Sequence, residues 1–172
     1  NSLIGTKFKV VTGYNSTAQI ALAMERGEVQ GIADWSWSSV KAVRPQWLRD
    51  KQATILLQGA LKNEPELGNL PNALDFIKND ADRKVLALHF TQKTAARPLV
   101  APPEVPPERI AILRKAFEDL AKDKDFLAEA DKLKIEIDFV PGNEIDKIVA
   151  QVAETPPDIA ARYTKAFAAE AK

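Results

Sequence analysis

The residues best suited to chemistry lie in a short polar corner near the start of this 172-residue chain. They are Tyr14, Asn15, Ser16, Thr17 and Ala18. Ser16 and Gln19 have the spacing of a capping box, in which a serine and a later glutamine side chain accept hydrogen bonds from backbone N–H groups. We expect a helix that Ser16 opens and Gly27 ends.

A helix start of this kind can bind an anion. The first backbone N–H groups of a helix have no partner inside the helix, and the helix dipole places partial positive charge there. A carboxylate or a phosphate can therefore bind at the corner. The alternative is an ordinary strand–turn–helix corner that binds nothing, and the pattern by itself leaves both interpretations open.

The elements around the corner predict a βαβ unit. Residues 8–11 and 29–33 are short apolar runs on either side of the expected helix, and such strands should be parallel. Ligands of open α/β sheets bind at the carboxyl ends of strands, so Asp34, Trp35 and Ser36 should lie near the corner. Trp35 can line a pocket or pack in the core.

Further elements follow along the chain. Strands are expected at residues 54–58 and 135–139, the latter because apolar and acidic residues alternate. Residues 84–90 have both helical and strand character. Helices are expected at 39–43, 73–79, from Asp80, at 107–122, 125–133, 145–152 and 159–167.

Composition excludes several kinds of chemistry. Lys plus Arg and Asp plus Glu both number 24, so no basic excess favours nucleic acid as a partner. The chain has no cysteine and one histidine, His89, which removes thiolate sites and most Ser-His-Asp schemes. No phosphate-binding loop, dinucleotide fingerprint or metal-ligand spacing is present. We therefore expect no cofactor, no metal and no catalytic residue.

Several motifs occur along the chain. They are GTKFKVVTGY at 5–14, ALAMERGEV at 21–29, Gln58 after two leucines, Pro65-Glu66-Leu67 with Leu70-Pro71, RPLVAPP at 97–103, and LRKAF at 113–117 with Asp123 and Asp125-Phe126. Together these motifs resemble those of one receptor family, the extracytoplasmic solute receptors of tripartite tricarboxylate transporters, also called the Bug family. The resemblance extends over nearly the whole chain.

The resemblance implies a periplasmic binding protein of type II, with two α/β lobes that hold a carboxylated ligand between them. This chain resembles the second half of such a receptor. Residues 1–97 would form the second lobe, and residues 98–172 would supply the crossover, the C-terminal helices and a strand of the other lobe. The family implies delivery to membrane transporter subunits and a periplasmic location, although no signal peptide is present in this chain.

The resemblance also assigns ligand contacts. Family members often have Pro-Gly-Ser after Gly-Tyr, whereas this chain has Asn15-Ser16-Thr17. By resemblance the contacts are Tyr14, Ser16, Thr17 and Ala18, and the residues themselves add Asn15, Asp34, Trp35 and Ser36.

Two other functions remain open from the sequence. One is an α/β enzyme domain that uses Asp34 or His89. The other is an interaction module, because the C-terminal helices carry apolar faces that a missing half would normally cover. For the same reason we expect this chain by itself to self-associate.

Overall fold

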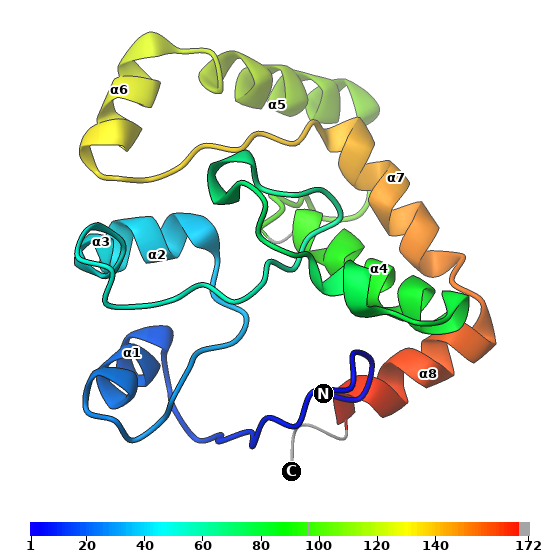
Figure 1. The fold of residues 1–172 in the computed structure, drawn as a ribbon. Helices are drawn as coiled ribbons and strands as arrows, with labels where there is room; N and C mark the ends of the chain where they lie inside the picture. Colours follow the sequence, from blue (N-terminus) through cyan, green and yellow to red (C-terminus); the bar gives the residue numbers. More distant parts are fainter. Residues whose placement is uncertain (96, 169–172) are drawn as a thin grey trace. The chain divides into compact units, whose positions relative to one another are not determined.

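The computed structural model describes residues 1–95 and 97–168, which are 54% helical with 1% strand. Figure 1 shows the helices joined by long irregular segments, with no sheet in the described chain. The helices are α1 (Thr17–Glu25), α2 (Trp37–Val43), α3 (Pro45–Arg49), η1 (Pro65–Leu67), η2 (Ala73–Phe76), α4 (Asp80–Thr94), α5 (Pro107–Leu120), α6 (Lys124–Lys132), α7 (Gly142–Ala153) and α8 (Pro157–Ala168).

The prediction of an α/β lobe of type II binding-protein fold with βαβ units is wrong. Residues 8–11, 29–33 and 135–139, expected as strands, form no strand. Within 54–58 only Gln58 makes a β-type contact, an isolated parallel bridge to Asn72. A strand needs a partner to satisfy its backbone groups, and alternation in one segment says nothing about whether a partner lies nearby.

Most of the predicted helices are confirmed. Ser16 is the N-cap of α1, and Pro107 is the first residue of α5, as the sequence indicated. Residues 84–90, whose type the sequence left open, belong to α4. The short helix expected at 73–79 is the 3-10 turn η2, which Asn72 and Asp75 close with a reciprocal capping box.

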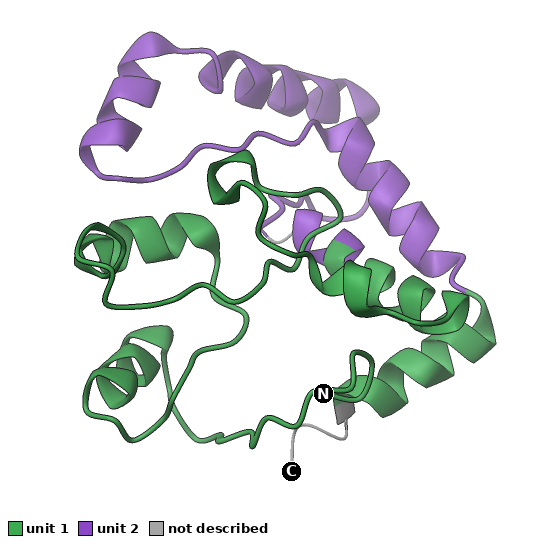
Figure 2. Cartoon of the chain, in the orientation of Figure 1, with its two compact units in different colours: residues 1–90, 156–172 green, residues 91–155 purple. Residues whose placement is uncertain are grey.

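The chain divides into two compact units, drawn in different colours in Figure 2. Unit 1 comprises residues 1–90 and 156–172, and unit 2 comprises residues 91–155. The predicted boundary between residues 97 and 98 refers to the lobes of a complete receptor and stays a prediction. Residues 169–172, the end of the predicted segment 98–172, lie outside the described residues.

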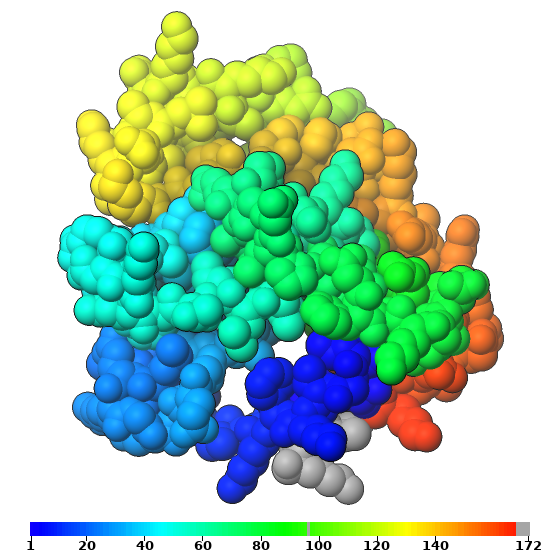
Figure 3. Space-filling model, in the orientation of Figure 1, coloured from blue at the N-terminus to red at the C-terminus, as the bar shows by residue number. Residues whose placement is uncertain are grey.

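Unit 1 has a core made by α4, α8 and η2. One cluster of buried residues contains Ala73, Ile77, Leu86 and Phe90, and a second contains Val85, Ile159 and Ala166. Leu3 packs against both clusters. In Figure 3 the N-terminal residues, in dark blue, lie against α4 in green and α8 in red. The N-terminal turn therefore joins the two halves of this core.

Two buried polar side chains hold the loop that leads into η2. Gln58 donates from Nε2 to the Leu70 carbonyl at 2.8 Å and accepts from the Glu64 N–H at 2.7 Å. Asn72 donates from Nδ2 to the Ala60 carbonyl and to Asn63 Oδ1, both at 2.9 Å. Burial of a polar group is costly unless its hydrogen bonds are made, so these bonds define the loop.

Unit 2 buries far fewer residues than unit 1. Of its described residues only Thr91 and Ala130 are buried, and α5 and α7 contain no buried residue. Its large apolar side chains are exposed at Leu99, Val100, Ile112, Leu113, Phe117, Leu120, Leu127, Leu133, Ile135, Ile137, Phe139 and Val149. An ion pair from Arg114 to Asp146, at 2.7 Å, connects α5 to α7.

Candidate functional site

The start of α1 has the geometry that the sequence predicted. Ser16 has extended backbone angles, and its hydroxyl oxygen accepts from the Gln19 N–H at 3.3 Å. The Gln19 side-chain oxygen accepts from the Asn15 N–H at 2.9 Å. The two side chains satisfy backbone donors reciprocally, in the manner of a capping box.

Two backbone donors of the first turn remain available. The N–H groups of Thr17 and Ala18 have no acceptor among the described residues. They precede the first N–H that bonds within the helix, at the end where the dipole is positive. An anion placed beyond Ser16 would find these two donors.

A groove of about 300 Å³ runs along the same helix. Its lining residues are Tyr14, Gln19, Leu22, Ala23, Arg26 and Glu28. The four residues from the helix and its C-cap have spacings of three and four, so they form one face of α1. Tyr14 is half-buried and contributes to the groove from the segment before the helix.

The groove combines an apolar floor with a cation. Leu22, which is 43% exposed, supplies aliphatic surface above the buried Ala23, and Arg26 supplies a guanidinium group. Arg26 Nη1 lies 3.8 Å from Glu28 Oε1, and both side chains are more than half exposed. Such a pair is worth little in water, so a ligand carboxylate can compete for Arg26.

Contacts of Glu25, next to the groove face, connect α1 to the rest of unit 1. Glu25 Oε1 accepts from Arg44 Nε at 2.9 Å and from Trp47 Nε1 at 3.1 Å. Trp47 is buried, and the Arg44 guanidinium lies over its ring at 5.8 Å from the centroid. Glu25 therefore connects α1 to α3, which leaves the face with Arg26 open.

The second predicted loop does not line this groove. Trp35 packs edge-on against Trp47, with ring centroids 5.9 Å apart, so the packing alternative for Trp35 is the one observed. Ser36 is the N-cap of α2 and shares a hydrogen bond of 2.7 Å with Ser39. Asp34 is exposed in a left-handed backbone conformation. Of the eight predicted contacts, Tyr14 alone is among the residues that line the groove.

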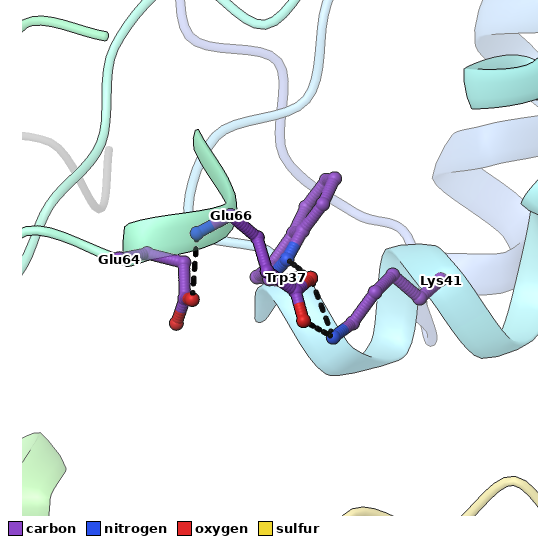
Figure 4. Close-up of polar contacts among 4 residues, drawn as sticks. All are labelled: Trp37, Lys41, Glu64 and Glu66. Carbon is purple, nitrogen blue, oxygen red and sulfur yellow. Dashed lines mark hydrogen bonds and ion pairs between the residues drawn. The ribbon is translucent and has the colours of Figure 1, made fainter. Parts of the chain in front are cut away.

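Trp37, the first residue of α2, contacts η1 (Figure 4). Its indole N–H donates to Glu66 Oε2 at 2.6 Å, and Lys41 donates to both carboxylate oxygens of Glu66, at 2.8 and 3.0 Å. Glu64 accepts from the Glu66 N–H at 3.2 Å. The bond from Lys41 and then that from Trp37 lower the pKa of Glu66. These contacts connect α2 to η1.

His89 lies in the packing between α4 and α8. Its ring stacks on Phe167 with centroids 4.5 Å apart, and its Nδ1 lies 3.2 Å from the Tyr163 hydroxyl. Burial lowers the pKa of His89. The α/β scaffold that the enzyme alternative required is absent from the described residues, and His89 has a structural role here.

Comparisons assign no family to this chain. No family model, curated protein or solved structure matches it. In the described part of the chain, no cluster of three or more potential metal ligands occurs, and no helix is long and apolar enough to cross a bilayer.

The sequence reasoning missed five groove residues: Gln19 as a lining residue, Leu22, Ala23, Arg26 and Glu28. A signal for them was present. Gln19, Leu22, Ala23 and Arg26 follow the i, i+3, i+4, i+7 spacing of one helix face. That face includes both an amide and a guanidinium group, and a face that only packs in a core would be uniformly apolar.

Proposed function

We propose that this chain belongs to an extracytoplasmic receptor that binds a small carboxylated molecule, with the α1 groove as one wall of the binding site. The observation that carries the proposal is the groove itself, in which Arg26 lies on the same helix face as the exposed aliphatic side chain of Leu22. A guanidinium group binds a carboxylate with two parallel hydrogen bonds, and the aliphatic floor accepts the ligand body.

Two further features support a carboxylated ligand. The N–H groups of Thr17 and Ala18 offer donors at the other end of α1. Tyr14, which the resemblance assigned to the ligand, lies in the groove lining. The resemblance to the Bug family supplies the rest of the proposal: periplasmic location and delivery to transporter subunits. The α/β lobe that the same resemblance implies is not part of the proposal.

The experiment is calorimetric titration of the chain with benzoate, succinate and glutamate. These probes represent an aromatic acid, a dicarboxylate and an amino acid. The groove is open on one side, so we expect a dissociation constant of roughly a millimolar for the best probe. Arg26→Gln should weaken it by about tenfold or more, because a charged hydrogen-bonding partner is lost.

Arg83→Gln is the matched control, since it removes a guanidinium from the exposed surface of α4. Binding that is equal in wild type and Arg26→Gln, or absent for all three acids, would contradict the proposal. An equal loss of affinity in both variants would mean that binding depends on the net charge of the chain and not on Arg26, which would also contradict the proposal.

An interaction module is the second candidate, favoured by the exposed apolar residues of unit 2. Exposed patches of this extent in soluble proteins usually mark a contact surface. Light scattering over a concentration series tests this candidate: growth of the mean mass would support it, and a constant monomer mass would contradict it.

A further inference from the structure

The α1 groove ends at a turn that fixes the backbone of Glu28. Gly27 has a left-handed conformation, with a φ of 76°, and follows the C-cap Arg26. The Gly27 N–H donates to the Met24 carbonyl at 3.0 Å, and the Glu28 N–H donates to the Ala23 carbonyl at 2.8 Å. These two bonds form a Schellman motif, which folds the chain back over the last turn of the helix. The motif therefore holds Glu28 close to Arg26 in the groove.

The groove offers a ligand one charge of each sign. Arg26 and Glu28 are the charged members of the described lining, and their nearest charged atoms are 3.8 Å apart. Glu25, the neighbouring acid on α1, accepts instead from Arg44 and Trp47. The Arg26 side chain is 70% exposed and the Glu28 side chain is 52% exposed, so one small ligand can reach both.

A ligand with a carboxylate alone satisfies only half of this charge pair. Its carboxylate, bound to Arg26, would bring a second negative charge close to Glu28, and like charges at such a separation repel. The negative end of the α1 dipole lies at the same turn and adds to the repulsion. A ligand that carries a cationic group beside its carboxylate avoids both effects.

The rest of the groove suits an apolar part of the ligand. Leu22 is 43% exposed and offers aliphatic surface, and the half-buried Tyr14 offers an aromatic ring. The Gln19 side-chain oxygen already accepts from the Asn15 N–H at 2.9 Å. A second carboxylate on the ligand would find no further cation in the described lining. An apolar group therefore fits this part of the groove better than a second charge.

We infer that the ligand of the groove is an amino acid with an apolar side chain, bound as its zwitterion. Arg26 donates to its carboxylate, Glu28 accepts from its ammonium group, and Leu22 and Tyr14 pack against its side chain. Each member of a weak ion pair then gains a charged hydrogen bond to the ligand. Glu28 determines the specificity, whereas Arg26 serves any carboxylate. The inference rests on the proposed function, since it requires that the groove binds a carboxylate.

The test compares leucine with isocaproate, which is leucine with a hydrogen atom in place of its ammonium group. Both are titrated into the isotope-labelled chain, and backbone amide chemical shifts report the binding. This measurement suits weak affinities and shows whether the ligand binds at residues 26–28. Leucine should bind about fivefold more tightly than isocaproate, which is the effect expected of one exposed ion pair.

Variants of Glu28 separate the ammonium group from the carboxylate. Glu28→Gln should weaken leucine binding by about fivefold and should not weaken isocaproate binding, because it removes only the partner of the ammonium group. Glu28→Lys should reverse the preference, so that isocaproate binds more tightly than leucine. Glu108→Gln is the matched control, since it removes the same charge at an exposed position of α5. It should leave the preference for leucine unchanged.

Failure of the inference is distinguishable from failure of the proposed function. If neither ligand binds, or if Arg26→Gln weakens neither, the proposed function fails and the inference falls with it. If isocaproate binds as tightly as leucine, the carboxylate site stands and the inference is overturned. The same holds if Glu28→Gln weakens both ligands equally, because Glu28 then only positions Arg26. Succinate that binds more tightly than leucine would also overturn the inference.

Discussion

Unit 1 and unit 2 contain similar helices, but only unit 1 packs its helices around a core. In unit 1, α4 and α8 pack together with η2 and the N-terminal turn, and Val85 is fully buried between them. In unit 2, α5 and α7 bury no residue, although both have apolar stripes. The composition of the helices therefore does not distinguish the units.

The difference lies in what the loops contribute. In unit 1 the loop before η2 is held by hydrogen bonds of the buried Gln58 and Asn72, and η2 packs against α4. The connections of unit 2 are an irregular segment at 135–141 and a proline-rich stretch at 98–106, neither of which contains a buried residue. An amphipathic helix is stabilised mainly by the surface that covers its apolar face, and unit 2 leaves much of that face uncovered.

Truncation of an aromatic residue in each unit gives the largest expected contrast. Phe90→Ala should reduce the free energy of unfolding by about 3–5 kcal/mol, because it leaves a cavity in the core of unit 1. Phe117→Ala, at a residue that is 38% exposed, should cost about 1 kcal/mol or less. Urea denaturation measures both, and equal losses would refute the contrast between the units.

A smaller contrast in stability is expected between two asparagine residues, one in each unit. Asn72→Ala removes the cap of η2 and leaves the Ala60 carbonyl without its donor, which should cost about 2–3 kcal/mol. Asn143→Ala, on the exposed surface of α7, should change stability by less than about 0.5 kcal/mol. The same denaturation assay applies, and a loss at Asn72 no larger than that at Asn143 would show that the buried bonds do not define the loop.

The core of unit 1 should weaken in mild acid. Burial holds the pKa of His89 below its ordinary value of 6.5, so the unfolded chain takes up a proton first. The stability that comes from the neutral His89 is therefore fully present above about pH 6.5, and it is lost as the pH decreases through the folded-state pKa. Asp82, which hydrogen bonds from Asn79 and Arg162 keep below its usual pKa, titrates in more acidic solution.

His89→Phe keeps a ring against Phe167 and removes the only histidine of the chain. Thermal unfolding at about pH 7.5 and about pH 5.5 should show a smaller loss for this variant than for wild type. An identical loss in the two proteins would mean that His89 does not link the core of unit 1 to pH.

The smallest expected effect is in unit 2, at the contact between α5 and α7. A Cβ at Gly142 would lie 2.6 Å from Arg114 Nε, so alanine there must displace the arginine from Asp146. The gain in helix stability and the loss of this exposed ion pair should nearly cancel in Gly142→Ala. In an Arg114→Ala background the same change should stabilise by about 0.5 kcal/mol. Equal effects in both backgrounds would contradict the contact.

The sequence predicted the helices because their signals are local. Ser16, Pro107 and the spacing of three and four residues each act within a few residues of themselves, and the structure confirms them. The strands failed because a strand depends on a distant partner. The alternation at 135–139 is that of an ordinary strand, yet the segment forms no strand in the structure.

The candidate site was predicted only in part, because only some of its features depend on local sequence. The cap at Ser16 and the position of Tyr14 follow from local sequence, whereas Asp34, Trp35 and Ser36 were placed by the rule for parallel sheets. Without a sheet that rule does not apply, and Trp35 packs on Trp47 instead. The helix face that contains Arg26 depends only on local periodicity and was available from the sequence.

Native-state hydrogen exchange in dilute solution tests the contrast between the units most directly. Amides of residues 84–90 in α4, which bond within the helix, should exchange only through global unfolding, because the core of unit 1 covers this part of the helix. Amides of α5 and α7 should exchange much faster, through local opening, since no buried residue holds these helices. Protection of α5 and α7 equal to that of α4 would contradict the account.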